Sequence, residues 1–274
     1  MRILVTNDDG IDSVGLHVLA RAMRPHGEVV VIAPDSEYSG ASAAIGAIHL
    51  MRPEIHRAHL DGLDEVWTVT GPPALCVMFA RMGAFGEPFD LVVSGLNPGA
   101  NVGRSVYHSG TVGACLTGRI GGISGIAVSQ DVSFGSVEGQ AWDEMLRNQL
   151  WDTAAAVASD VVAAIAERPF TEPSVVNINV PNLPLDELKG WRRTALATVP
   201  IRAMRLVELE PKIGHEGAFR VNLTWGDAQV LPIETDAGAV SAGYVSLSWI
   251  SRLMAIDPDP ADAAVVEGAL DARR

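Results

Sequence analysis

The 274-residue chain has few lysines and few cysteines, and each shortage excludes a class of protein. Lys189 and Lys212, its only lysines, are followed by Gly and Ile, so the Lys-Ser/Thr pair of a P-loop nucleotide site is absent. No lysine is present near an early strand end, which excludes the phosphorylation site of a response-regulator receiver. Cys76 and Cys115 are too few for a disulfide framework, and we expect both in the core.

Other motifs are missing as well. No G-x-G-x-x-G follows a predicted strand and no G-x-S-x-G occurs, which argues against a dinucleotide cofactor and a nucleophile elbow. No apolar run reaches the roughly 18 residues that span a membrane, and no leader-like segment opens the chain, so we expect a cytoplasmic protein. With 20 basic and 33 acidic residues the net charge is −13, which argues against a polynucleotide or an anionic membrane as the main partner.

What the first part of the chain does contain is an alternation of strand and helix signals. Short apolar runs predict strands at residues 2–6, 28–33, 65–70, 90–94, 125–129 and 175–180. Helical periodicity predicts helices at 14–26, 73–82, about 109–119 and 142–167. This order predicts an α/β fold with a doubly wound, mostly parallel sheet.

The later part of the chain has a different pattern. Scattered β-like pieces with Gly and Pro fill residues 190–250, and a short helix is expected at 261–270. We therefore divide the chain into an α/β catalytic core (1–185), a β-rich extension or oligomerisation segment that returns to the core (186–250), and a C-terminal helix and tail (251–274).

The most informative feature is an acidic pair at the end of the first strand. Residues 2–6 run into Asn7-Asp8-Asp9-Gly10. Two adjacent carboxylates repel each other, and a hard divalent cation is the usual compensator. The alternative is an ordinary turn with an Asp that caps the next helix, and the motif alone supports both equally.

Three further loops, rich in Gly, Ser and Asn, follow predicted strands or open a predicted helix. They cover residues 33–42, 94–103 and 108–114. Ligands of open α/β sheets bind at the carboxyl ends of the strands, so these loops and the acidic pair are expected to meet there. Ser109-Gly110-Thr111 at a helix start would offer N–H groups to a phosphate. With no lysine available, metal-assisted hydrolysis is the chemistry that remains.

At these motifs the chain resembles the SurE family of metal-dependent nucleotidases over about residues 1–250. The matching segments are Asn7–Ile11, Ala33-Pro34 with Ser39-Gly40, Ser94–Gly103, Ser109–Ala114, Asn177–Pro181, Thr235-Asp236 and Gly243–Ser246. The resemblance implies a Rossmann-like core and a C-terminal extension used in forming a homodimer or homotetramer. It also implies one divalent metal ion, Mg²⁺ or Mn²⁺, and hydrolysis of nucleoside 5′- and 3′-monophosphates.

The resemblance also implies roles for individual residues. The metal ligands would be Asp8, Asp9, Ser39 and Asn97. The phosphate would be surrounded by Gly40, Asn101, Ser109, Gly110 and Thr111. Catalysis would fall to Asp8, Asp9, Ser109 and Thr111, with Asp9 orienting or deprotonating the attacking water and Ser109–Thr111 stabilising the developing charge. A covalent aspartyl-phosphate is the competing mechanism.

Some questions stay open at this stage. His108 stands where the family usually has a tyrosine, and it could contact the phosphate, donate a proton or simply fill the tyrosine's space. The base, the 5′ or 3′ preference, the metal and the oligomer size are not fixed by these motifs. The alternatives for function are a broad acid phosphatase or exopolyphosphatase, and a nucleotide-binding regulatory protein with low turnover.

Overall fold

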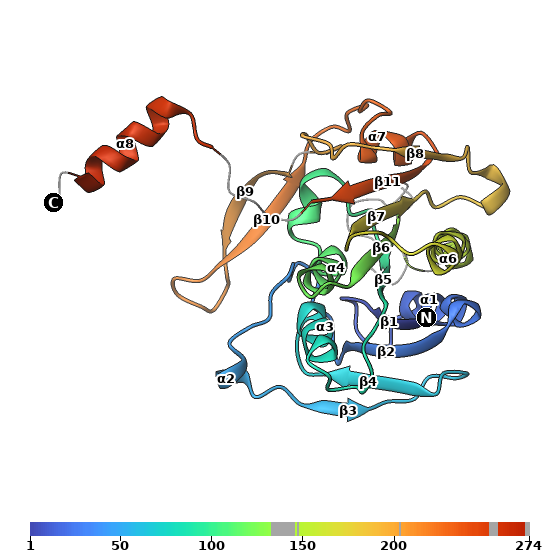
Figure 1. Ribbon diagram of the computed structural model, residues 1–274. Helices are drawn as coiled ribbons and strands as arrows, with labels where there is room; N and C mark the ends of the chain where they lie inside the picture. Colours follow the sequence, from blue (N-terminus) through green and yellow to red (C-terminus); the bar gives the residue numbers. More distant parts are fainter. Residues whose placement is uncertain (133–145, 147, 203, 252–256, 272–274) are drawn as a thin grey trace.

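The computed structural model describes residues 1–132, 146, 148–202, 204–251 and 257–271. Its body is a nine-stranded sheet covered by helices on both faces, and a small two-stranded sheet and one helix extend away from it (Figure 1). None of the helices in these ranges is both long and apolar enough to cross a membrane.

The sheet confirms the predicted α/β fold. Its strand order is β3-β4-β2-β1-β5-β6-β7-β11-β8. The parallel strands from β4 to β7 are β1 (Arg2–Thr6), β2 (Glu28–Pro34), β4 (Glu65–Val69), β5 (Leu91–Pro98), β6 (Ser124–Gln130) and β7 (Val175–Val180). Read in chain order, these six strands lie 3-2-1-4-5-6, the doubly wound order in which β1 and β5 flank the switch point.

The outer strands complete the sheet. β3 (Ile55–Arg57) pairs antiparallel with β4, β11 (Val245–Ile250) pairs antiparallel with β7, and β8 (Trp191–Arg193) runs parallel to β11. Two strands from the segment beyond residue 186 therefore belong to the main sheet. The other two, β9 (Met204–Pro211) and β10 (Phe219–Trp225), form the separate antiparallel hairpin.

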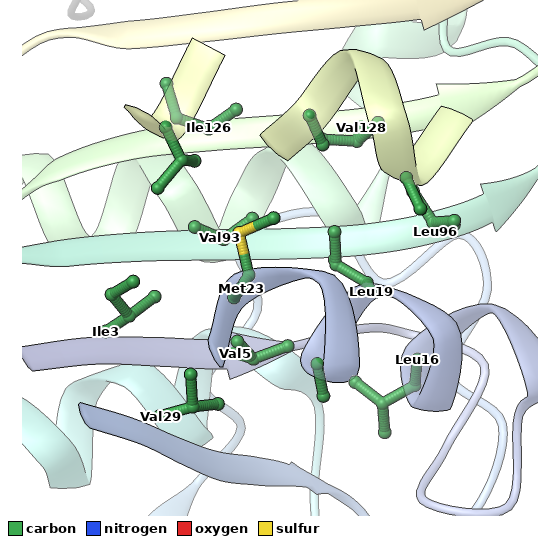
Figure 2. Packing of buried hydrophobic residues seen from close by; sticks show 14 of the residues in the cluster. Ile3, Val5, Leu16, Leu19, Met23, Val29, Val93, Leu96, Ile126 and Val128 are labelled. Carbon is green, nitrogen blue, oxygen red and sulfur yellow. The ribbon is translucent and has the colours of Figure 1, made fainter. Parts of the chain in front are cut away.

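Helices cover the two faces in pairs. On one face α1 (Val14–Met23) packs against α6 (Trp151–Glu167), and on the other α3 (Pro73–Arg81) packs against α4 (Gly110–Ile120). Ile3 and Val5 of β1 face the first layer with Leu16, while Leu4 faces the second (Figure 2). Because both faces of the strand are buried, its sequence is a continuous apolar run.

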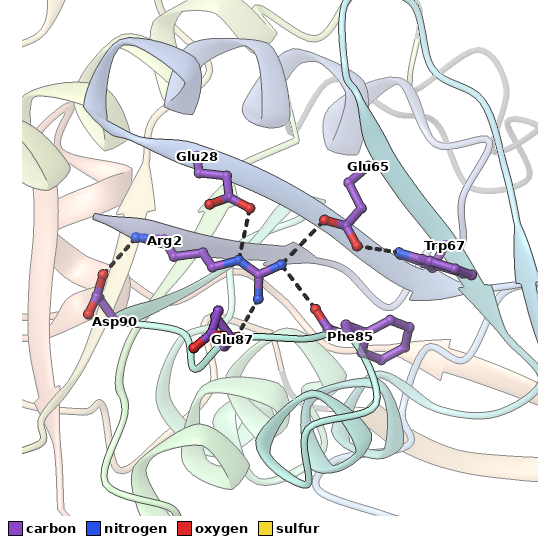
Figure 3. Close-up of polar contacts among 7 residues, drawn as sticks. All are labelled: Arg2, Glu28, Glu65, Trp67, Phe85, Glu87 and Asp90. Atoms are coloured by element: carbon purple, nitrogen blue, oxygen red, sulfur yellow. Dashed lines mark hydrogen bonds and ion pairs between the residues drawn. The ribbon is translucent and has the colours of Figure 1, made fainter.

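The amino end of the sheet is held by one arginine (Figure 3). The Arg2 guanidinium forms ion pairs with Glu28 at 2.9 Å and Glu65 at 3.3 Å, and it also donates to the carbonyls of Phe85 and Glu87. These contacts join β1, β2, β4 and the loop before β5 at the end of the sheet opposite to the loops at the carboxyl ends of β1 and β5, so they serve stability.

The structure corrects some predicted boundaries. The long helix expected at 142–167 begins, as α6, at Trp151, and residues 142–145 and 147 lie outside the described part of the chain. The predicted helix at 14–26 ends at Met23 and continues as a 3₁₀ turn, η1 (Arg24–His26), because Pro25 cannot donate to an α-helical bond. The stretch 190–250, for which only β-like pieces were expected, also contains a short helix, α7 (Asp236–Ser241).

The C-terminal helix α8 (Pro260–Asp271) was predicted and lies apart from the body (Figure 1). A short helix α2 (Ile48–Met51) and the 3₁₀ turns η2 (Gly103–Tyr107) and η3 (Leu185–Glu187) complete the described elements.

Candidate active site

The candidate site lies where the sheet changes winding direction. Strand β1 pairs with β2 on one side and with β5 on the other, and Thr6 is level with Ser94. The acidic pair that follows β1 therefore leaves the sheet beside the glycine-rich loop that ends β5. This neighbourhood follows from topology, since successive crossovers on opposite faces open a crevice at the carboxyl ends.

Asp8 is buried and is held by the start of α4. Its Oδ1 accepts from the Thr111 hydroxyl at 2.6 Å, and its Oδ2 accepts from the Gly110 N–H at 3.1 Å. A Cβ at position 110 would lie 2.7 Å from the Asp8 Cβ, so only glycine allows this approach. Burial raises the pKa of Asp8, and the hydrogen bonds from Thr111 and Gly110 oppose that rise.

The first residues of α4 therefore hydrogen-bond directly to the Asp8 carboxylate. Ser109 is the N-cap residue, and its Oγ accepts from the Val112 N–H at 3.1 Å. The Ser109 N–H donates to the Ser105 carbonyl and the Gly110 N–H to Asp8, so two of the N–H groups predicted to bind a phosphate already have acceptors within the protein. Among the described residues the Ser109 hydroxyl accepts a hydrogen bond and is not seen to donate one.

Asp9 is the uncompensated member of the pair. Its Oδ2 is buried and has no hydrogen-bond partner in the described chain. Burial, followed by the charges of Asp8 and Glu37, raises the pKa of Asp9 to about 8. No described Lys, Arg or His forms an ion pair with either aspartate. An unpartnered buried carboxylate oxygen beside a second acid fits a hard divalent cation, which takes oxygen donors.

The loop after β2 packs over this pair. The Tyr38 N–H donates to the Asp8 carbonyl at 2.7 Å, and the Ser42 N–H donates to the His108 carbonyl at 3.1 Å. The Ser39 hydroxyl donates to Glu37 Oε1 at 2.5 Å. The loop therefore brings Ser39, an expected metal ligand, to the same edge as the aspartates, and it adds Glu37, which sequence reasoning did not select.

The loop after β5 carries the two candidate asparagines. Asn97 Nδ2 donates to the Gly99 carbonyl at 2.6 Å, and this bond does not engage its Oδ1, the atom that a cation would bind. Asn101 Nδ2 donates to Ser129 Oγ at 2.9 Å. The Asn101 carbonyl accepts from Asn177 at 2.8 Å and from Asn179 at 3.1 Å, both on β7. The two β7 asparagines thus fix the loop to the sheet.

A third anchor of this loop comes from far along the chain. Asp236, at the start of α7, is fully buried, and its Oδ2 accepts from the Gly103 N–H at 2.7 Å. Its Oδ1 accepts from the N–H groups of Ala197 and Ala237. The motif around Asp236 was noted in the sequence, but no pattern could show which loop it holds.

Within the described residues, no group of three or more His, Cys, Asp and Glu side chains comes together as a metal cluster. A cation here would therefore depend on the two aspartates together with amide and hydroxyl oxygens, which are the donor types of the predicted set Asp8, Asp9, Ser39 and Asn97.

Comparison with known proteins places this arrangement in a family. A model described as "Survival protein SurE" matches residues 3–202. The chain belongs to the SurE family. It is 36% identical to the 5′-nucleotidase SurE of Haemophilus influenzae strain PittGG over 91% of both chains. It is 35% identical to that of Mannheimia succiniciproducens over 91% of this chain and 92% of the relative.

A solved structure agrees with the SurE assignment. The crystal structure of the SurE protein from Aquifex aeolicus superposes with a TM-score of 0.74 at 28% identity, covering 99% of this chain and 100% of that one. The likeness therefore extends beyond the matched region and includes the segment after residue 202.

His108 stands at a position where the resemblance led us to expect a tyrosine. It is exposed at the end of η2, and its backbone carbonyl accepts from the Ser42 N–H of the loop after β2. A role for the imidazole in phosphate contact stays a prediction.

The raised pKa of Asp9 predicts how the stability of this protein depends on pH without metal. The folded protein keeps a proton on Asp9 up to about pH 8, whereas the unfolded chain loses it near the ordinary aspartate pKa of 3.8. Stability of the metal-free protein should therefore fall as pH rises between about 4 and 8. Melting temperatures measured in EDTA over this range should decline, and the decline should be smaller in Asp9→Asn. If the melting temperature fell equally steeply with pH in both proteins, the raised pKa of Asp9 would be contradicted.

Proposed function

We propose that this chain is a metal-dependent phosphomonoesterase that hydrolyses nucleoside 5′-monophosphates, and 3′-monophosphates as well, to nucleoside and phosphate. The observation that carries the proposal is the buried pair Asp8 and Asp9, one carboxylate fixed by the start of α4 and the other with an oxygen, Oδ2, that has no partner among the described residues. The printed activity of the two relatives, 5′-nucleotidase, supports the same conclusion.

The residues proposed to hold the cation are Asp8, Asp9, Ser39 and Asn97, with Mg²⁺ or Mn²⁺ as the ion. When bound, such a cation supplies Lewis-acid stabilisation of charge on the phosphate oxygens. Within the chain, Thr111 and Gly110 keep the Asp8 carboxylate in one orientation. A held carboxylate loses little entropy on ligand binding, so the site is preorganised.

Asp9 is proposed to orient or deprotonate the attacking water, because its Oδ2 is the carboxylate oxygen without a partner in the described chain. The Ser109 hydroxyl is proposed to donate to a phosphate oxygen. Thr111 acts through Asp8, and Gly40, Asn101, His108 and Gly110 line the proposed phosphate region.

We also propose that the chain forms a homodimer or homotetramer through its C-terminal extension. The hairpin β9–β10 projects from the body and exposes Leu209, Ile213, Phe219 and Val221, and α8 exposes Val265 and Val266 (Figure 1). Apolar side chains on a projecting arm are typical of an interface. The proposed boundaries of the three segments stay at residues 185 and 250.

The test is phosphate release from a panel of nucleoside 5′- and 3′-monophosphates with Mn²⁺, Mg²⁺ or EDTA, in the intact protein and in Asp9→Asn. We expect turnover that needs metal and is lost in the variant. Equal turnover of nucleotides and short polyphosphates would point to a broad phosphatase or exopolyphosphatase. Nucleotide binding without release under any metal would point to a regulatory protein and overturn the proposal.

A further inference from the structure

A cavity of about 530 Å³ opens beside the proposed metal site. Asp9, from the loop after β1, and Pro98, at the end of β5, form one part of its wall, and Gln149 and Trp151, before and at the start of α6, form another. A substrate whose phosphate reaches Asp9 would extend the rest of its structure into this space. Nothing in the motif pattern predicted a role for the segment before α6.

Gln149 is the unusual member of this wall. It is only 8% exposed, and both its Nε2 and its Oε1 lack a hydrogen-bond partner in the described chain. A buried amide with neither atom paired is costly and needs an explanation, such as a ligand that pairs with it. A primary amide offers one donor and one acceptor side by side, which matches the edge of a nucleobase.

The backbone around Gln149 is held firmly. Leu150, the next residue, accepts from the Gln130 side chain at 2.8 Å through its carbonyl. Its N–H donates to the Asn182 side chain at 2.9 Å. Gln149 and Trp151 flank this doubly anchored residue, so their side chains project from a fixed position, as a recognition site requires.

Trp151 and its neighbours supply an apolar surface. Trp151 is partly buried against the core, and it borders the cavity together with Val14 and Pro98. An aromatic face next to a paired donor and acceptor is the usual combination for holding a base, since stacking tolerates every base while the amide reads its edge.

The charge of the cavity supports a neutral occupant. Asp12 and Glu37 also line it, and no Lys, Arg or His does so among the described residues. Further phosphate groups would be repelled there, whereas an uncharged base and sugar would not. The geometry therefore favours a monophosphate whose nucleoside end enters the cavity.

We propose that this cavity is the nucleobase site, in which Gln149 pairs with the hydrogen-bonding edge of the base and Trp151 packs against its face. The proposal rests on the proposed nucleotidase function and adds to it the residues that recognise the base, through which nucleoside monophosphates are preferred over phosphate esters without a base. Gln149 and Trp151 are specificity-determining residues.

The test compares 5′-AMP with ribose 5-phosphate, which shares the sugar and the phosphate but has no base. The quantity measured is the ratio of the two kcat/KM values. We expect Gln149→Leu to lower this ratio by about tenfold, as loss of a paired donor and acceptor does. Trp151→Leu should lower it too, and Trp151→Phe should retain more of it. Gln229→Leu, the same change at an exposed glutamine, is the matched control.

A ratio near one in the intact protein, or a ratio that Gln149→Leu leaves unchanged, would overturn the inference while nucleotide turnover itself upheld the proposed function. If no substrate turns over, binding of adenosine, which lacks the phosphate, decides separately. Binding by the intact protein and Gln229→Leu that is weakened about tenfold in Gln149→Leu would support the base site even then. No measurable adenosine binding would overturn it.

Discussion

Replacing Asp9 by asparagine is expected to make the metal-free protein more stable and to abolish its catalysis. The Asp9 carboxylate is buried beside Asp8, with one oxygen unpartnered in the described chain, so its charge destabilises the fold. A neutral amide removes that repulsion. Above pH 8, where Asp9 is charged, we expect the melting temperature in EDTA to rise by about 2–4 °C, equivalent to roughly 1 kcal/mol.

Turnover should move in the opposite direction. Without the second carboxylate the site loses a proposed metal ligand and its proposed proton acceptor, and we expect kcat/KM for a nucleoside monophosphate to fall by about 10³-fold or more. The stabilisation that Mn²⁺ gives to the intact protein should shrink in parallel. Scanning calorimetry with and without Mn²⁺, together with phosphate release, measures both effects.

The control is Asp64→Asn, the same chemical change at an exposed position away from the site. This control should change neither the melting temperature in EDTA nor kcat/KM. A lower melting temperature for Asp9→Asn in EDTA would mean that Asp9 is paired in the folded protein, and retained turnover would show that it is not catalytic.

Replacing Asp236 is expected to damage the site from a distance. Asp236→Asn can still accept from Ala197 and Ala237 through Oδ1, but its amide nitrogen would face the Gly103 N–H, donor against donor. The loop that carries Asn97 and Asn101 would lose this anchor. We expect a stability loss of about 1–3 kcal/mol and a fall in kcat of about tenfold or more.

Two comparisons separate positioning from simple destabilisation. Asp236→Ala leaves all three N–H groups without an acceptor and should lose more stability than Asp236→Asn. Asp186→Asn, at an exposed position, should behave as the parent protein. Measurements well below each melting temperature keep all variants folded. If Asp236→Asn retained full kcat at such a temperature, the position of the loop after β5 would not depend on Asp236.

The sheet was predictable because its strands are buried on both faces. Residues such as Leu4 and Val30 form continuous apolar runs whose positions can be read directly, and the alternation with helices fixes parallel pairing. Asp8 and Asp9 were found by the same reasoning, since their place at a strand end follows from the strand itself.

Other features depend on contacts that no local pattern encodes. Glu37 reaches the acidic pair because the Tyr38 N–H binds the Asp8 carbonyl, a contact between loops about 30 residues apart. Gln149 stands out only once its amide is seen to lack a partner in the described chain. The short helix α7 escaped detection because its six residues, Asp-Ala-Gly-Ala-Val-Ser, have little helical periodicity.

The central position of β1 has a consequence for synthesis on the ribosome. Its partner on one side, β2, emerges soon afterwards, but β5 on the other side begins only at Leu91, and the helix that holds Asp8 begins at Gly110. Domains fold as their residues emerge from the N-terminus, so the middle of this sheet must wait for more than a third of the chain. Until then Asp8 lacks the Thr111 and Gly110 donors that hold it in the folded protein, so the proposed metal site can form only after α4 has been synthesised.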